Sequence, residues 1–134
     1  MSDSAQNTPS ALEAAWLGQD GGLLPSAKNV QILRDAEIKT GFIAEVIGVS
    51  KWQLEQGFTA ESQLGRGATT ILRDLTLTVK VLRVGGYDAE RIEKALEERF
   101  PDEQPIDDFS SMRRMDCIKA NPLVVQVWAH GEIG

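Results

Sequence analysis

A glycine between two short apolar segments constrains the fold of this chain more than any other feature. In the stretch GFIAEVIGVSKWQLEQGF, residues 41–58, apolar side chains at helical spacing stand on both sides of Gly48. Glycine adopts positive φ without steric cost, so it can turn the chain sharply between two helices. Ser50 is placed to cap the second helix. The stretch therefore predicts a short helix over 41–47 and another over about 51–57.

Two helices that cross within a few residues need a small side chain where they touch. Ala44 meets this need, because it lies one helical turn before Gly48. Thr40 is the expected N-cap of the first helix. The apolar residues around Ala44 are expected to form the buried side of the pair: Ile43, Ile47, Val49 and Leu54.

Apolar periodicity predicts helices in the rest of the chain as well, over about 27–38, 89–100 and 109–120. Asp88 is the expected N-cap of the second of these, and Asn121-Pro122 is a stop-and-start signal after the third. The last residues form either a short helix or an extended arm. The predicted fold is all-α, a compact multi-helix domain.

The run over 68–84 fits two kinds of structure. Leu75, Leu77, Val79 and Val81 alternate with polar residues, as in a strand of a winged helix. A different apolar set lies at helical spacing: Ile71, Leu72, Leu75, Val79 and Leu82. The length of the run favours the helix, and the strand is the alternative.

Composition excludes several classes of protein. The 134-residue chain has 42% hydrophobic and 25% charged residues, as one globular domain does. No apolar run approaches the roughly 20 residues of a membrane span, and no signal peptide is recognisable, so a cytoplasmic location is expected. Cys117 and His130 are the only residues of their types, which leaves no disulfide and no zinc ligand set. Without a nucleophile–base set, neither an enzyme nor a cofactor is expected.

Charge is distributed unevenly along the chain, whose net charge is −6. Residues 88–108 hold nine acidic and three basic residues, whereas residues 59–87 have an excess of basic ones. A phosphate backbone meets one face of a protein and not its net charge. The distribution therefore permits DNA binding by the middle of the chain.

Four parts are expected along the chain: a disordered tail over 1–10, a helical domain over 11–100, an acidic linker over 101–108 and a C-terminal helical segment over 109–134. The last part holds too many large apolar side chains for a free tail. Because two prolines interrupt the linker, we expect this segment to pair with a second copy and to form a dimer. The residues expected at that interface are Met112, Met115, Val127 and Trp128.

The stretch around Gly48 resembles the helix-turn-helix of phage repressors and activators, the lambda-repressor-like regulators. The spacing from Ala44 to Gly48 to Leu54 is the family's pattern, and IGVS is its commonest turn spelling. The resemblance extends loosely over 27–100 as a bundle of helices. One departure is Gly57, which stands where the family has an apolar residue, and it indicates a recognition helix that ends early.

The resemblance implies a sequence-specific DNA-binding transcriptional regulator of bacterial or phage origin, with a recognition helix over about 50–57 in the major groove. The groove-facing positions map onto Ser50, Lys51, Trp52, Gln53 and Gln56. Lys39 and Thr40 map onto the place where the first helix meets the phosphate backbone, and Arg66 is a further phosphate contact. A homodimer on double-stranded DNA is implied, with recognition helices about 34 Å apart.

A second class of function fits the same residues. A protein–protein module, such as a phage inhibitor or an antitoxin-like adaptor, would hold a basic partner through these helices and the acidic segment 88–108. Glu45 and Glu55 favour this alternative, because carboxylates repel phosphate. Trp52 fits the core or a partner surface as well as it fits DNA.

Overall fold

The computed structural model describes residues 25–56, 64–100 and 112–133, and within these ranges the chain is helical without any strand. The helices are α3 (Pro25–Asp35), α4 (Thr40–Ile47), α5 (Lys51–Gln56), α6 (Arg66–Val84), α7 (Ala89–Glu97), α8 (Arg114–Ala120) and α9 (Pro122–Ile133). The all-α prediction is therefore confirmed. The expected tail over 1–10 and the expected linker over 101–108 lie outside the described residues.

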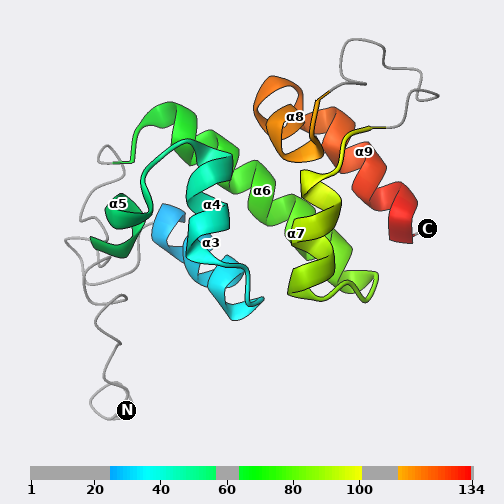
Figure 1. Cartoon of the computed structure of the whole chain (residues 1–134), viewed down its shortest axis with the longest axis horizontal. Helices are drawn as coiled ribbons and strands as arrows, with labels where there is room; N and C mark the ends of the chain where they lie inside the picture. The colour runs from blue at the N-terminus through cyan, green and yellow to red at the C-terminus, as the bar shows by residue number, and fades with distance from the viewer. Residues whose placement is uncertain (1–24, 57–63, 101–111, 134) are drawn as a thin grey trace.

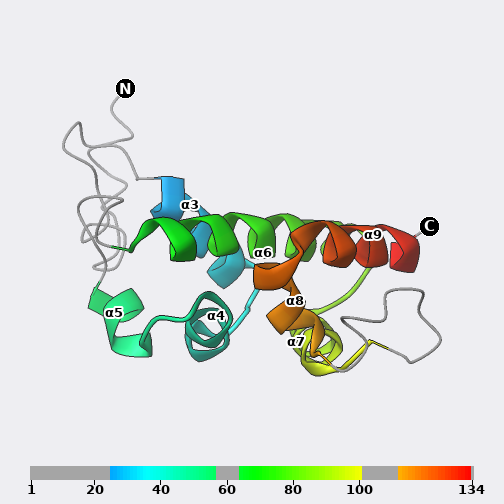
Figure 2. The same cartoon turned by 90° about the horizontal axis from the view of Figure 1, so that it is seen from above.

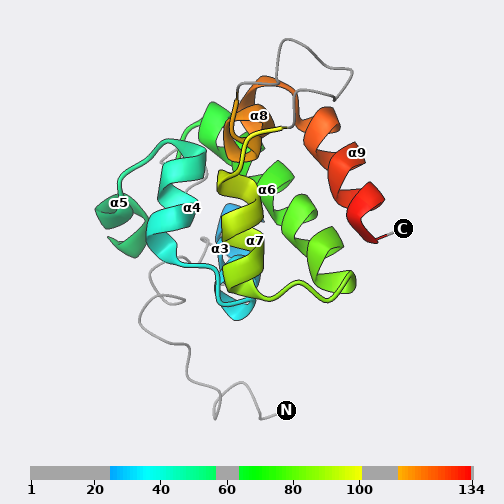
Figure 3. The same cartoon turned by 45° about the vertical axis from the view of Figure 1, so that its right-hand side comes forward.

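Helix α6 runs through the middle of the bundle (Figure 1) and contacts α3, α4, α8 and α9. Figure 2 shows α9 continuing the level of α6, with α4, α5, α7 and α8 below them. Turning the molecule brings α7 in front of α6, between the α4–α5 end and the α9 end (Figure 3). The two ends of the bundle thus share one central helix.

The ambiguous run over 68–84 is helix, part of α6. Its fully buried residues Leu72, Leu75 and Leu82 lie on one face, which a strand would divide between two faces. Thr76 and Thr78 are buried too, and each hydroxyl donates to a backbone carbonyl one turn earlier, at 2.8 Å and 2.9 Å. These hydrogen bonds satisfy the hydroxyls, so the core tolerates both threonines.

Local signals at helix ends are confirmed in part. The Asp88 carboxylate accepts from the Arg91 amide at 2.8 Å, and Asn121-Pro122 separates α8 from α9. The expected cap at Thr40 is wrong: Thr40 is the first residue of α4, and its hydroxyl accepts a hydrogen bond from the Arg34 guanidinium. This bond joins the end of α3 to the start of α4.

The C-terminal helices pack on α6 of their own chain, and this differs from the expected separate dimerisation segment. Val125 and Ala129 of α9 are fully buried, and Gln126 donates to the Thr78 hydroxyl of α6 at 2.8 Å. Met115 of α8 is 1% exposed, so it belongs to the core and cannot contact a second copy. Packing of α8 and α9 on α6 is favoured because the side of α6 that they cover would otherwise be exposed to water.

Arg114 joins the three helices at this end of the bundle. Its guanidinium lies 4.5 Å from the centre of the Trp128 ring and 5.1 Å from that of Phe100. It also donates to the Ala95 carbonyl at 3.0 Å and lies 3.5 Å from the Glu98 carboxylate. Trp128, expected to anchor a dimer, therefore has an intramolecular partner and is partly buried against the core. Helix α8 begins at Arg114, whereas the prediction placed its start at 109.

No helix in the described ranges has the length and apolar character needed to cross a bilayer.

Asp74 generates a prediction about pH. Its side chain on α6 is 13% exposed, and burial raises the pKa of its carboxyl above the ordinary 3.8, with partial compensation from Arg73. A raised folded-state pKa means that ionised Asp74 lowers the free energy of unfolding at neutral pH. The free energy of unfolding recovers as the pH falls through the folded-state pKa, because Asp74 then becomes protonated and neutral.

Asp74→Asn is therefore expected to raise the melting temperature at neutral pH, and the gain should shrink as the pH falls toward 3.8. Thermal unfolding followed by circular dichroism over that pH range measures it. Asp116→Asn is the control, because Asp116 pairs with Arg113 at 3.0 Å and should give no gain. A melting temperature that drops for Asp74→Asn at neutral pH would contradict the argument.

Candidate nucleic-acid interface

Helices α4 and α5 are joined by a three-residue turn whose geometry follows from its residues. Gly48 lies in the left-handed region at φ 81°, and its amide donates to the Ala44 carbonyl at 2.9 Å. Ser50 caps α5, since its hydroxyl accepts from the Gln53 amide at 3.0 Å. The glycine turn and the serine cap were both expected, and the structure has both.

The helix pair buries one side and leaves the other free. Five of the eight residues of α4 are buried, and Ala44 among them is 3% exposed. In α5 only Leu54 is buried. Leu54 thus anchors α5 in the core, and the exposed positions of α5 are available for a partner.

The first turns of α4 and α5 lie side by side. A Cβ placed on Gly41 would stand 3.9 Å from Cδ of Lys51, so the lysine side chain passes over the start of α4. The N-cap residue of α4, Lys39, makes no side-chain hydrogen bond to the helix. Free amides at a helix start carry partial positive charge, and the stem of the Lys51 side chain lies beside this start.

The structure brings most of the predicted DNA-binding residues to this end of the molecule, which we call the α4–α5 surface. Trp52 is 68% exposed, whereas Thr40 and Gln53 are half-buried. Arg66 is exposed at the start of α6, beyond residues 57–63, which lie outside the described ranges. The remaining predicted residues are all exposed: Lys39, Ser50, Lys51 and Gln56.

Carboxylates near this surface are mostly engaged. Glu55 lies 4.0 Å from Lys51 in an exposed pair, which contributes little to stability and exchanges easily for another anion. Glu45 pairs with Arg113 of α8 at 3.4 Å. Sequence reasoning missed Arg113, because only folding brings it to Glu45 across 68 positions of chain.

Lys39 has a less favourable environment for phosphate than Lys51. It shares a cavity of about 400 Å³ with the acidic side chains of Glu37, Asp88, Glu90 and Glu93. Its backbone amide donates to the Glu93 carboxylate at 3.0 Å. These carboxylates oppose the approach of a second anion, so Lys51 is the stronger candidate of the two lysines.

The α4–α5 surface therefore offers amide, hydroxyl and ammonium donors beside an exposed indole ring. Within the residues that the structure describes, no group of three His, Cys, Asp or Glu side chains could hold a metal ion. Comparisons with protein-family models, with curated proteins and with solved structures found no match.

A pair of glycine substitutions tests the turn. Gly48→Ala is expected to lower the free energy of unfolding by ~1 kcal/mol, because alanine is strained at positive φ. Gly67 is the matched control: it lies in α6 with open space around it, and alanine there should stabilise by ~0.5 kcal/mol. Urea unfolding of both variants measures the difference. Equal effects at the two positions would contradict the left-handed turn.

Proposed function

We propose that this chain binds duplex DNA through the α4–α5 surface, with α5 in the major groove, and regulates transcription in a bacterium or phage. The observation that carries the proposal is the side-by-side placement of the first turns of α4 and α5, with Lys51 over Gly41. A phosphate group on this surface would meet free amides and an ammonium together. Because Leu54 is the one buried residue of α5, the exposed side chains of Lys51 and Gln56 are left for DNA.

The residues of the surface divide into two roles. Lys51, Ser50 and the amides at the start of α4 suit phosphate oxygens, which fix the position of a protein on DNA without reading its sequence. Gln56 is exposed near the end of α5, and a glutamine amide can pair with adenine through two hydrogen bonds. Gln53 is half-buried, so we assign base reading to Gln56 first.

A recognition helix of six residues reaches few base pairs, so we propose that two copies act together. The exposed side of α9 is the best surface for pairing: Leu123 is 68% exposed and Val127 is 65% exposed, one turn apart. Helix α9 lies at the opposite end of the bundle from α5 (Figure 1). Pairing through α9 would therefore leave the α5 helix of each copy uncovered.

The second candidate function is binding of a basic protein. The cavity lined by Glu37, Asp88, Glu90 and Glu93 presents four carboxylates beside a single lysine. Such a surface complements a cationic partner and repels DNA. This candidate would use α7 and leave α5 unused.

DNA binding is tested by two substitutions that should act differently. Lys51→Ala should weaken binding to all duplexes alike and reduce the salt slope by about 1, since one phosphate contact is lost. Gln56→Ala should cost about 1–3 kcal/mol at one base position and relax preference there. Fluorescence anisotropy with duplexes selected from a random pool measures both.

Lys94→Ala on α7 is the control for charge, because Lys94 is exposed and borders a cavity with Trp128 of α9, away from the α4–α5 surface. If no duplex is enriched from the pool, or if Lys94→Ala weakens binding as much as Lys51→Ala, the proposed DNA surface is wrong. Retention of a basic protein that is lost on Glu90→Lys would then favour the second candidate.

Pairing through α9 predicts opposite results for two variants. Leu123→Asp with Val127→Asp should give a monomer in sedimentation and leave the melting temperature of the monomer nearly unchanged, because both side chains are exposed. Trp128→Ala should instead destabilise the fold by ~2 kcal/mol through loss of the contact with Arg114. A wild-type chain that sediments as a monomer at micromolar concentration would refute this dimer.

A further inference from the structure

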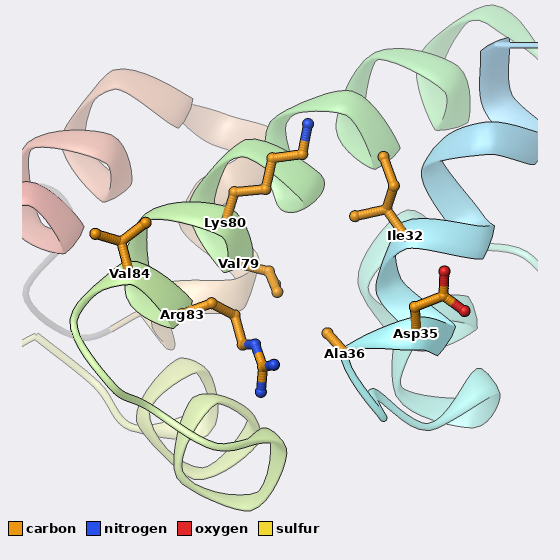
Figure 4. A pocket seen from close by; sticks show the side chains of 7 residues that line it. All are labelled: Ile32, Asp35, Ala36, Val79, Lys80, Arg83 and Val84. Carbon is orange, nitrogen blue, oxygen red and sulfur yellow. The ribbon is translucent and has the colours of Figure 1, made fainter.

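A groove between α3 and α6 lies outside the α4–α5 surface. Figure 4 shows Ile32, Asp35 and Ala36 on the α3 side and residues of α6 on the other. The α6 residues are Val79, Lys80, Arg83 and Val84, and the cavity has a volume of about 450 Å³. This volume lies within the range of sites that hold small molecules, roughly 300–1,000 Å³.

The floor of the groove is apolar. Val79 is 1% exposed and Ala36 is 8% exposed, and they lie close together at its centre (Figure 4). Ile32 forms the wall on the α3 side, and Val84, which is 81% exposed, borders the cavity at the far side of α6, where its side chain points away from Ile32 (Figure 4). The small side chain of Ala36 leaves the space open, because it does not reach far enough to fill the gap between the two helices. An apolar body in this space would shield Ile32 and the apolar floor from water.

Two cations border this floor. Among the described residues, neither the Lys80 ammonium nor the Arg83 guanidinium takes part in an ion pair or a side-chain hydrogen bond. The one carboxylate of the groove, Asp35, accepts from the Gln31 amide at 2.9 Å and does not pair with Arg83. By contrast, Arg113 and Arg114 elsewhere in the chain are held by carboxylates.

We propose that this groove binds a small amphipathic carboxylate. Its apolar body lies on Val79 and Ala36, and its carboxylate meets Arg83, whose planar guanidinium suits two parallel hydrogen bonds. Lys80 adds attraction from the other edge of the groove (Figure 4). A neutral ligand would leave both cations unused, and a cationic ligand would be repelled. The site is independent of DNA binding, since it shares no residue with the α4–α5 surface.

Decanoate is the probe, used with the full chain below its micelle concentration. Calorimetry should show saturable one-to-one binding, and amide shifts in NMR spectra should be confined to the groove residues of α3 and α6. Decanol has the same apolar body without the charge, and its affinity should be at least about tenfold lower than that of decanoate. Arg83→Gln should weaken decanoate binding by about tenfold and leave decanol unchanged.

Lys28→Gln is the matched control, because Lys28 is exposed on α3 outside the groove. It should leave decanoate affinity unchanged. Both variants alter exposed side chains, so unchanged melting temperatures are expected and confirm that the fold is retained. Absence of saturable binding, equal affinity for decanol and decanoate, shifts centred on other helices, or equal losses for Arg83→Gln and Lys28→Gln would each overturn the proposal.

Discussion

The apolar face of α6 is the constraint on which the other helices depend. Its leucines at 72, 75 and 82 are fully buried, and burial of each is worth about 1.5–3 kcal/mol relative to exposure. The face is wide enough to require cover on both sides, which α3 and α4 provide at one end and α8 and α9 at the other. A substitution that disturbs α6 therefore reaches both ends of the bundle.

This arrangement separates a rigid scaffold from a lightly attached helix. The core holds α4 through five buried side chains, so the start of α4 has a fixed direction. Helix α5 takes its direction from the left-handed glycine, from the serine cap and from Leu54, its one buried residue. Its orientation is thus set by the backbone of the turn more than by contacts. Few buried contacts are therefore needed to present the polar side chains of α5 to solvent.

Sequence patterns predicted the features that depend on neighbouring residues. The turn at Gly48, the cap at Asp88 and the break at Asn121-Pro122 each follow from the chemistry of a few adjacent residues, and each is present. The helical spacing over 68–84 also indicated α6 correctly. Such signals are local, so no knowledge of the rest of the fold is needed to read them.

The features that depend on distant residues could not be predicted in this way. The apolar content of the C-terminal segment was recognised, but an apolar side chain such as Met115 fits a core and an interface equally well. Met115 lies in the core because α8 and α9 cover a side of α6 that would otherwise be exposed. No sequence pattern reveals that this side of α6 is open. Arg114 between two aromatic rings and Arg113 beside Glu45 are likewise products of folding. The proposed DNA surface rests on features set by neighbouring residues, such as the turn at Gly48. The proposed α9 interface rests on the way distant segments of the chain pack together.

The attachment of α5 through Leu54 has a consequence for the dynamics of the free chain. A helix of six residues with one buried side chain can open without disturbing the rest of the core, so its amides are expected to exchange with solvent far faster than those of α6. A partner that requires the helical form must then supply the free energy of holding it closed. Affinity for that partner would be lower than the contacts alone imply, and substitutions that favour helix in α5 would raise affinity without touching the partner.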